Sequence, residues 1–171
     1  MNIIKILIKT LKLLNSNASP WTIASGMALG MLAGLTPGFP LHDYLVIFLI
    51  LFFNVSIPAA LFSMLLSGLI GLLLTAPAHM LGYQLLVSTP GMTPLWTTLY
   101  NMPLIPFTRF YNSVVLGTTV IGLICFVPVM LGMKSFIGYY RKNLQQKVMK
   151  WKIMQILNIG GWLNVEDKIM G

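Results

Sequence analysis

Long apolar runs separated by short breaks of proline, glycine and polar residues organise the chain. Between about residue 20 and residue 133, apolar segments of helical length follow one another with very few charged positions. Breaks near Pro20, Pro37 and Pro58, and a longer one at residues 88–106, divide this region into four parts. The pattern predicts an all-α integral membrane fold with four short or broken apolar helices, at about 20–35, 41–53, 57–86 and 107–134.

The first apolar helix carries a stripe of glycine. Ser19 is a candidate N-cap and Pro20 suits the first helical position, so we expect the helix to begin there. Gly26, Gly30 and Gly34 recur every four residues and therefore lie on one face. In lipid such a bare face lets another backbone approach closely, and we expect it to pack a partner helix.

The break at Thr36–Asp43 ends this helix and contains Thr36, Pro37, Gly38 and Pro40. Two prolines around a glycine prevent a continuous helix from passing through. The first helix is short, because about 16 residues cover about 24 Å, against about 30 Å of hydrocarbon. Two interpretations stay open for the helices on either side: a tight pair of full spans, or a re-entrant hairpin whose tip stops inside the membrane.

The second half of the apolar region contains further proline breaks. We expect the third helix to kink at Pro77, where Thr75 can satisfy a freed carbonyl. The segment 88–106 has four prolines and no charge, and it contains Trp96 and Tyr100. This composition predicts a loop in the interfacial aromatic belt of a membrane.

The two ends of the chain are basic and amphipathic. Lys5, Lys9 and Lys12 share one face of a helix predicted over residues 2–15, and the tail after Lys134 combines further basic residues with an apolar face. We therefore expect an amphipathic interfacial helix at 1–16, a membrane domain at 17–134 and a basic cytoplasmic amphipathic tail at 135–171.

The composition agrees with lipid as the main solvent. The 171 residues are 57% hydrophobic and 8% charged, whereas soluble domains carry about 25% charged residues. The net charge of +8 comes from bases that flank the apolar region, as the positive-inside rule describes, and no nucleic-acid recognition motif accompanies it. We expect both termini in the cytoplasm, two or four crossings between them, and no nucleic acid as a partner.

Asp43 and Arg109 are the two fixed charges between Lys12 and Lys134. A charged group inside a membrane costs about 2.5–3.5 kcal/mol at a helix centre, so it should be paired or hydrated. We expect Asp43 and Arg109 either to form an ion pair or to line a polar pocket together, with His42 beside them. The alternative is that both reach toward lipid headgroups. Set among aromatics that include Trp96 and Tyr100, Arg109 could also hold a lipid phosphate.

No pattern of catalytic or metal-ligating residues accompanies these charges. The three acidic residues are scattered, the two histidines have no ligand spacing, and no phosphate-binding Gly-Lys loop is present. Cys125 is the single cysteine and lies in an apolar run, which favours an inert buried thiol. The sequence therefore predicts no enzyme, no cofactor and no metal site.

Several motifs resemble a widespread family of small bacterial membrane proteins of unknown function. They are the Ser19-Pro20-Trp21 start, the Gly26, Gly30 and Gly34 stripe, the Thr36-Pro37-Gly38 turn, and Thr75-Ala76-Pro77, where alanine replaces the family's usual asparagine. The residues around Trp96 and Arg109 resemble a narrower Gram-negative subfamily. That subfamily accompanies a large periplasmic protein of the AsmA-like lipid-bridge group. The resemblance covers about residues 15–130.

The resemblance implies a bacterial inner-membrane protein with a lipid-bridge partner. The expected function is then a non-enzymatic subunit of a phospholipid-transport assembly, which docks a membrane-anchored AsmA-like periplasmic protein and helps phospholipid leave the inner membrane. Two alternatives stay open. The chain could be a small lipid transporter or scramblase that acts alone, or a membrane scaffold for envelope and glycan assembly.

Overall fold

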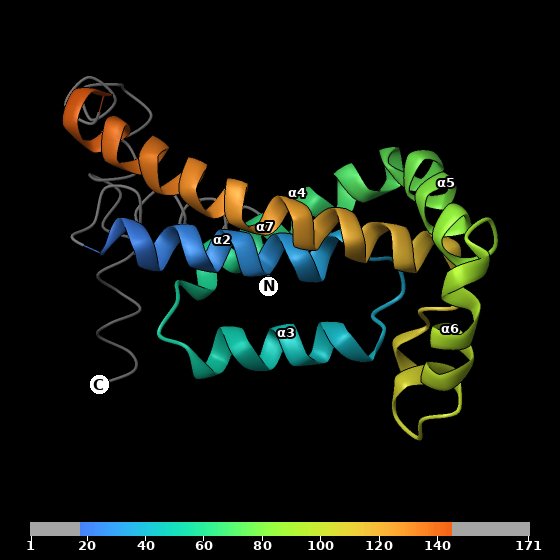
Figure 1. Ribbon diagram of the computed structural model, residues 1–171. Coiled ribbons are helices and arrows are strands. Elements are labelled where there is room, and N and C mark those ends of the chain that lie inside the picture. The colour runs from blue at the N-terminus through green and yellow to red at the C-terminus, as the bar shows by residue number, and fades with distance from the viewer. Residues whose placement is uncertain (1–17, 145–171) are drawn as a thin grey trace.

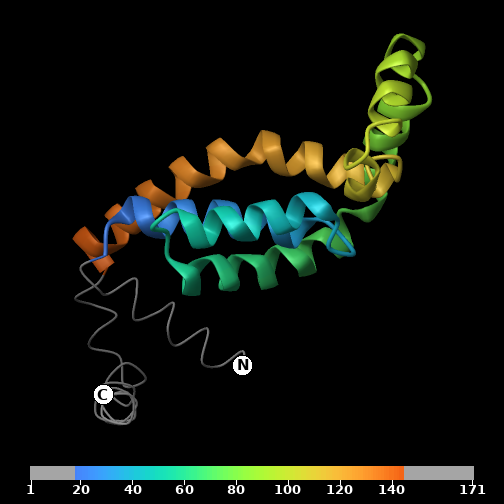
Figure 2. The same cartoon turned by 90° about the horizontal axis from the view of Figure 1, so that it is seen from below.

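Residues 18–144 are described by a computed structural model, and within this range the chain is all-helical with no strand. Four helices form an elongated body: α2 (Pro20–Leu35), α3 (Leu41–Phe52), α4 (Ile57–Leu73) and α7 (Ser113–Tyr139) (Figure 1). An arm projects from one end of this body (Figure 2). It consists of α5 (Thr75–Leu86), α6 (Thr93–Tyr100) and the 3-10 turns η1 (Pro90–Met92) and η2 (Ile105–Thr108). A π-helical turn, η3 (Tyr140–Leu144), follows α7. The predicted all-α class is confirmed for these residues.

Both ends of the described chain lie at the same end of the body, which we call the basic end. The Arg141 guanidinium donates to the carbonyl of Ala18 at 2.6 Å, and the Lys134 ammonium lies 4.0 Å above the Trp21 ring. The Thr36–Asp43 turn lies at the opposite end, which we call the turn end (Figure 1). The chain therefore runs along the body four times, through α2, α3, α4 and α7.

The helix starts follow local capping chemistry. The hydroxyl of Ser19 accepts from the Trp21 amide at 3.3 Å, with Pro20 in the first turn, so the predicted start of α2 is confirmed. The same arrangement recurs at α4, where the Ser56 side chain accepts from the Ala59 amide at 3.4 Å. Asn112 caps α7 by accepting from the Val114 amide at 2.9 Å. α7 therefore begins six residues later than the predicted start at 107, because residues before Asn112 form η2 and a turn.

The glycine stripe of α2 packs against α4 of the same chain. A Cβ at Gly26 would lie 2.7 Å from the Ser56 carbonyl oxygen, and a Cβ at Gly30 or Gly34 would overlap the carbonyl of Ala60 or Met64. The expected close approach of another backbone is therefore present. The occupant differs from the expected partner helix, because α4 belongs to the same chain and already fills the groove. A partner helix would need another surface.

A second close approach holds the arm on the body. A Cβ at Gly82 of α5 would overlap the Ser113 carbonyl, and a Cβ at Gly117 of α7 would overlap the Ala78 carbonyl. His79 adds a polar contact at this interface, since its Nδ1 lies 2.6 Å from the Ser113 hydroxyl. The sequence pattern did not predict that Gly82 and Gly117 each face an opposing backbone.

The predicted kink near Pro77 is a true break between two helices. α4 and α5 meet at an angle of 75°, and the break lies at Leu74, three residues before Pro77. A proline ring clashes with the carbonyl four residues earlier, here that of Leu73, so the disruption appears one turn upstream. As expected, Thr75 satisfies freed carbonyls: its hydroxyl contacts those of Gly71 and Leu72 at 3.2 and 2.9 Å.

The segment 88–106 was predicted to be a loop and instead contains a helix. Pro94 lies in the first turn of α6, where a missing amide hydrogen costs nothing, so this proline starts a helix rather than breaking one. At the other end of the body, α7 continues past Pro128 and past the predicted boundary at 134 to Tyr139. The helix predicted at 1–16 and the tail beyond residue 144 lie outside the described residues.

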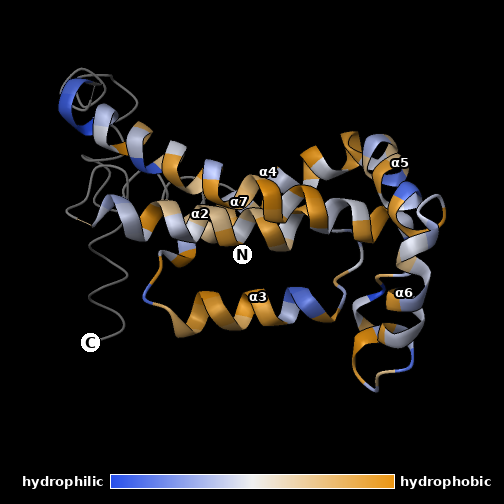
Figure 3. Cartoon of the chain, viewed as in Figure 1, coloured by the Kyte–Doolittle hydropathy of each residue, from blue (hydrophilic) through white to orange (hydrophobic). Residues whose placement is uncertain are grey.

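The helices of the body consist largely of apolar residues (Figure 3). The continuous helix from Ser113 to Asn143 contains an 18-residue window with mean hydropathy 2.5, so it is long and apolar enough to cross a membrane. α4 and α5 pass the same test only as a bent pair, and α2 and α3 are shorter apolar helices. Large apolar side chains are widely exposed, and Leu73 at 82% is the extreme case. These features are consistent with a helical membrane protein.

Candidate functional site

Asp43 is an acidic side chain that the fold buries completely. It lies in the first turn of α3, where its backbone amide donates to the Pro40 carbonyl at 2.9 Å. Its side chain is 0% exposed, and neither carboxyl oxygen has a hydrogen-bond partner among residues 18–144. Buried polar atoms in folded proteins are nearly always hydrogen-bonded, so an orphaned carboxyl calls for a functional explanation.

His42 lies between this carboxyl and the surface. Its Nε2 is 3.5 Å from the Oδ1 of Asp43 and 3.1 Å from the hydroxyl oxygen of Thr119 on α7, and its side chain is 24% exposed. The single hydroxyl proton of Thr119 is donated to the Val115 carbonyl at 2.7 Å. This leaves the Thr119 oxygen free to accept from His42, which favours the imidazole tautomer with its proton on Nε2. Sequence reasoning missed Thr119, although Thr118-Thr119 is a polar pair inside an apolar helix.

The backbone of the Thr36–Asp43 turn has an unusual conformation just before His42 and Asp43. Gly38 and Phe39 both have positive φ, at 84° and 47°, while Pro37, Gly38 and Phe39 are exposed. Thr36 and Pro40 are buried, and the Thr36 hydroxyl has no hydrogen-bond partner within the described range. The middle of the turn is therefore exposed, while the polar side chains at its two ends, Thr36 and Asp43, are buried.

Arg109 reaches this turn from the arm. Its Nη1 lies 3.4 Å from the Gly38 carbonyl oxygen, 71 residues away in the chain. Arg109 follows η2 in the left-handed conformation, with φ 55°, which directs the chain from the arm toward α7. None of the ion pairs among residues 18–144 joins Arg109 to Asp43. The predicted ion pair is therefore not formed in this structure: Arg109 contacts the Gly38 carbonyl, whereas Asp43 is buried in the first turn of α3.

Trp96 and Tyr100 form an aromatic cluster in the arm. The Trp96 ring stacks on Phe110 with centroids 5.8 Å apart, and Tyr100 packs edge-on against Tyr111 at 5.9 Å. The Trp96 indole donates to the Leu85 carbonyl at 2.9 Å, which anchors α6 to α5. With Leu86, Thr97 and Asn101, these four rings line a cavity of about 320 Å³.

The predicted polar pocket is therefore divided into two places. Asp43 and His42 lie under the turn, whereas Trp96 and Tyr100 line the cavity in the arm. Arg109 joins them, because it contacts the turn through Gly38 and is followed in the chain by Phe110 of the aromatic cluster. A polar, aromatic and cationic surface thus gathers at the turn end of an otherwise apolar body.

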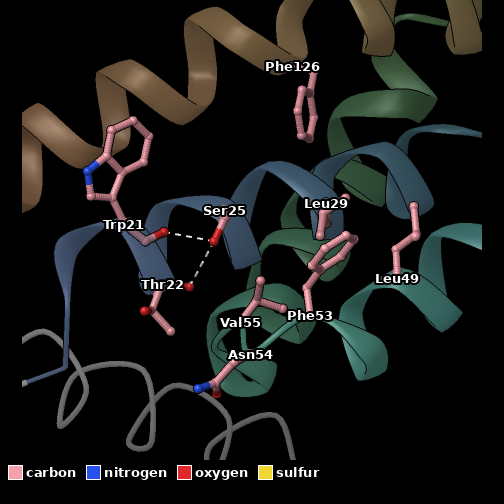
Figure 4. Close-up of a pocket in the computed structure, with 9 residues that line it drawn as sticks. All are labelled: Trp21, Thr22, Ser25, Leu29, Leu49, Phe53, Asn54, Val55 and Phe126. Carbon is pink, nitrogen blue, oxygen red and sulfur yellow. Dashed lines mark hydrogen bonds between the residues drawn. The ribbon is translucent and has the colours of Figure 1, made fainter.

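A larger hollow lies toward the basic end and was not predicted. It measures about 500 Å³ and opens between α2, the α3–α4 connection and α7. Figure 4 shows the rings of Trp21, Phe53 and Phe126 around it, while Ser25 turns back to bond carbonyls of its own helix, those of Trp21 and Thr22. Its remaining lining residues are Leu29, Leu49, Asn54 and Val55. Pockets of this size are large enough for a small-molecule ligand.

Within residues 18–144, no group of three or more histidine, cysteine, aspartate or glutamate side chains is placed to hold a metal ion. The single cysteine, Cys125, is partly buried in α7.

Comparison with known proteins finds similarity to bacterial proteins. A protein of Treponema pallidum (strain Nichols), described as an uncharacterized protein, is 26% identical over 145 residues, which are 85% of this chain and 89% of the relative. No solved structure matches the chain. The profile of a bacterial family matches residues 6–146, a range that includes all the candidate site residues above. The expected kinship with a bacterial family of unknown function is thereby confirmed: the chain belongs to DUF2062, described as "Uncharacterized protein conserved in bacteria".

Proposed function

We propose that this chain is a multi-pass protein of the bacterial inner membrane, with its basic end at the cytoplasmic face. Support comes from the exposed apolar surface and from the position of Lys134 and Arg141 at one end of the body. Positively charged residues favour the cytoplasmic side of membrane helices. The turn end would then face the periplasm, and the four runs of the chain would be four crossings.

Within that membrane, we propose a non-enzymatic subunit of a phospholipid-transport assembly that helps lipid leave the bilayer at the turn end. The observation that carries this proposal is the contact of Arg109 with Gly38. This contact brings a guanidinium, the exposed turn and the aromatic arm together at one end of an apolar body. Guanidinium groups bind phosphate in a bidentate manner, and tryptophan and tyrosine favour the headgroup region.

The short helices supply a reason why lipid would leave at this place. α2 and α3 have 16 and 12 residues, so they cover about 24 and about 18 Å of a hydrocarbon layer about 30 Å thick. α4 and α5 are bent by 75° rather than continuing as one span. Helices shorter than the bilayer thin it locally, which lowers the barrier for a headgroup to move.

The proposed partner is a large periplasmic AsmA-like protein anchored by a membrane helix. Because α4 fills the glycine groove of α2, the partner helix would dock elsewhere, and the outward face of α3 is the best candidate. Asp43 and Ile50 are the two buried residues of α3. Its exposed face is large and apolar: Tyr44, Leu45, Phe48, Leu51 and Phe52.

Lipid retention after mild solubilisation tests the headgroup site. We expect native mass spectrometry to find bound phospholipid on the wild-type protein and about tenfold weaker retention on Arg109→Gln, since hydrogen bonds to charged groups contribute about 1.5–3 kcal/mol. Lys142→Gln is the matched control, because Lys142 is exposed at the basic end. Equal retention by both variants would remove Arg109 from the lipid site.

Co-purification tests the partner. We expect a large periplasmic protein to remain bound in mild detergent and to be lost when Phe48 and Phe52 on α3 are changed to serine. A lone protein that moves labelled lipid between the leaflets of liposomes would favour the stand-alone scramblase instead. A lone protein without lipid activity would favour an envelope scaffold.

Cysteine labelling tests the orientation. Phe39 is 52% exposed at the tip of the turn, so Phe39→Cys in a Cys125→Ala background should react with a membrane-impermeant thiol reagent added from the periplasmic side. Protection at residue 39 from that side would instead favour a re-entrant hairpin or the opposite orientation.

A further inference from the structure

We propose that Asp43 is a proton-binding site, loaded and unloaded through His42. The two residues form one unit at the start of α3, visible as the hydrophilic patch on that otherwise apolar helix in Figure 3. The carboxyl is fully buried, and the imidazole beside it is partly exposed. This inference stands on the geometry of the pair and does not depend on what the protein transports.

The surroundings of Asp43 favour a proton as the missing partner. An ionised carboxylate in an apolar interior needs a counter-charge or hydrogen bonds, and both of its oxygens lack hydrogen bonds here. A bound proton removes the charge without needing further ligands. In membrane proteins, buried acidic residues beside histidine are typical of proton relays.

His42 is the titratable side chain that faces Asp43. α2 and α4 pack against α3 and contain no titratable residue, while α7 contributes the hydroxyl of Thr119. Arg109 follows η2, and its guanidinium donates to the Gly38 carbonyl at 3.4 Å. Tyr44, the next residue of α3, is exposed at the surface. The route from outside to the carboxyl therefore passes through the imidazole.

The geometry also describes how the proton would move. His42 Nε2 carries a hydrogen directed at the Thr119 hydroxyl, 3.1 Å away, and the Oδ1 of Asp43, 3.5 Å from the same nitrogen, lies next to it without a hydrogen bond in this conformation. A proton arriving at Nδ1 gives the imidazolium, which then releases the Nε2 proton to Oδ1 and returns to a neutral ring. Rotation of the ring, or proton loss and gain at its two nitrogens, restores the starting state. Charge and protons balance in each step.

Infrared spectroscopy of the full-length protein in lipid tests this inference directly. The chain has three acidic side chains, so its carboxyl signals can be assigned with few variants. Asp43 is expected to show the C=O stretching band of a protonated carboxylic acid near neutral pH. The band should persist in the Glu166→Gln, Asp167→Asn double variant and disappear in Asp43→Asn.

The kinetics of deuterium exchange test the route. In heavy water the shift of this band should be severalfold slower in His42→Gln than in the wild type. His79→Gln is the matched control, because His79 lies in the arm against Ser113 and should leave the rate unchanged. If Asp43→Asn does not fold, the Asp167→Asn variant can be produced with carboxyl-labelled aspartate. Asp43 is then the single aspartate in the sequence, so the labelled band belongs to it.

Three results would overturn the inference. Carboxylate bands from Asp43 near neutral pH would show that it holds no proton. Loss of the acid band when sodium is added at constant pH would assign the site to a metal cation instead. Exchange as fast in His42→Gln as in the wild type would remove His42 from the route.

Discussion

Gly30 of α2 and Ala60 of α4 pack backbone against backbone, so closely that a Cβ at residue 30 would overlap the Ala60 carbonyl. The same relationship repeats one turn away in each direction, at Gly26 and Gly34. This contact joins the first and third runs of the chain and places α3 outside them. The turn after α2 leads the chain into α3 beside the packed α2–α4 pair. Asp43 lies in the first turn of α3 and is therefore placed at this end of the pair.

The first prediction concerns this contact. Gly30→Ala should reduce the stability of the folded protein by about 1–3 kcal/mol, because the added methyl group forces the two backbones apart. Gly132→Ala on α7 is the control, since no atom lies within 4 Å of a Cβ there and alanine favours a helix. Thermal unfolding in mild detergent measures both, and an equally stable Gly30→Ala protein would contradict the packing.

Much of this arrangement could be predicted from the pattern of residues. The starts of α2 and α4 follow from Ser-Pro and Ser-Ile-Pro signals, and the spacing of Gly26, Gly30 and Gly34 required a close neighbour. The identity of that neighbour could not be predicted, because a small-residue face fits any apolar helix equally well. Only the tertiary structure shows that α4 of the same chain fills it.

The second prediction concerns the turn. Gly38→Ala should reduce stability by about 1–2 kcal/mol, since alanine resists a left-handed backbone. Its Cβ would also lie 3.1 Å from the Arg109 guanidinium, at φ 84°. Gly91→Ala is the control, because its Cβ would meet nothing within 4 Å. Thermal unfolding compares the two, and equal loss of stability would contradict the strained turn.

The third prediction concerns the two charges between the basic ends. Because Asp43 and Arg109 form no ion pair here, the Asp43→Arg, Arg109→Asp double variant should be no more stable than the less stable single variant. Expression level and thermal unfolding of the four proteins give the coupling energy. A double variant that recovers wild-type stability would show a direct pair that this conformation does not contain.

The fourth prediction concerns the arm. Pro77→Ala should allow α4 and α5 to straighten from their 75° bend, because the clash with the Leu73 carbonyl is removed. Spin labels at Leu69 and Tyr83, both exposed, should then lie farther apart in a Cys125→Ala background. An unchanged distance would show that packing of Gly82 and Gly117 against opposing backbones holds the arm without help from Pro77.

The differences from expectation at the site have physical reasons. The four prolines of segment 88–106 favoured a loop, but Pro94 lies at a helix start, where proline is tolerated. An ion pair between Asp43 and Arg109 was one of the arrangements expected for two opposite charges in an apolar region, and in the structure Arg109 contacts the Gly38 carbonyl instead. Thr119 contacts His42 across 77 residues, and a single sequence carries no signal for such a contact.

Phospholipid transfer from proteoliposomes tests the central claim most directly. The wild-type chain with its co-purified partner should deliver labelled phospholipid to acceptor vesicles, with Lys142→Gln at the wild-type rate and Arg109→Gln about tenfold slower, equivalent to about 1.4 kcal/mol. The chain without its partner should deliver little. The account would be contradicted if the Arg109→Gln complex transferred lipid at the wild-type rate. It would also be contradicted if the chain without its partner transferred lipid as fast as the complex.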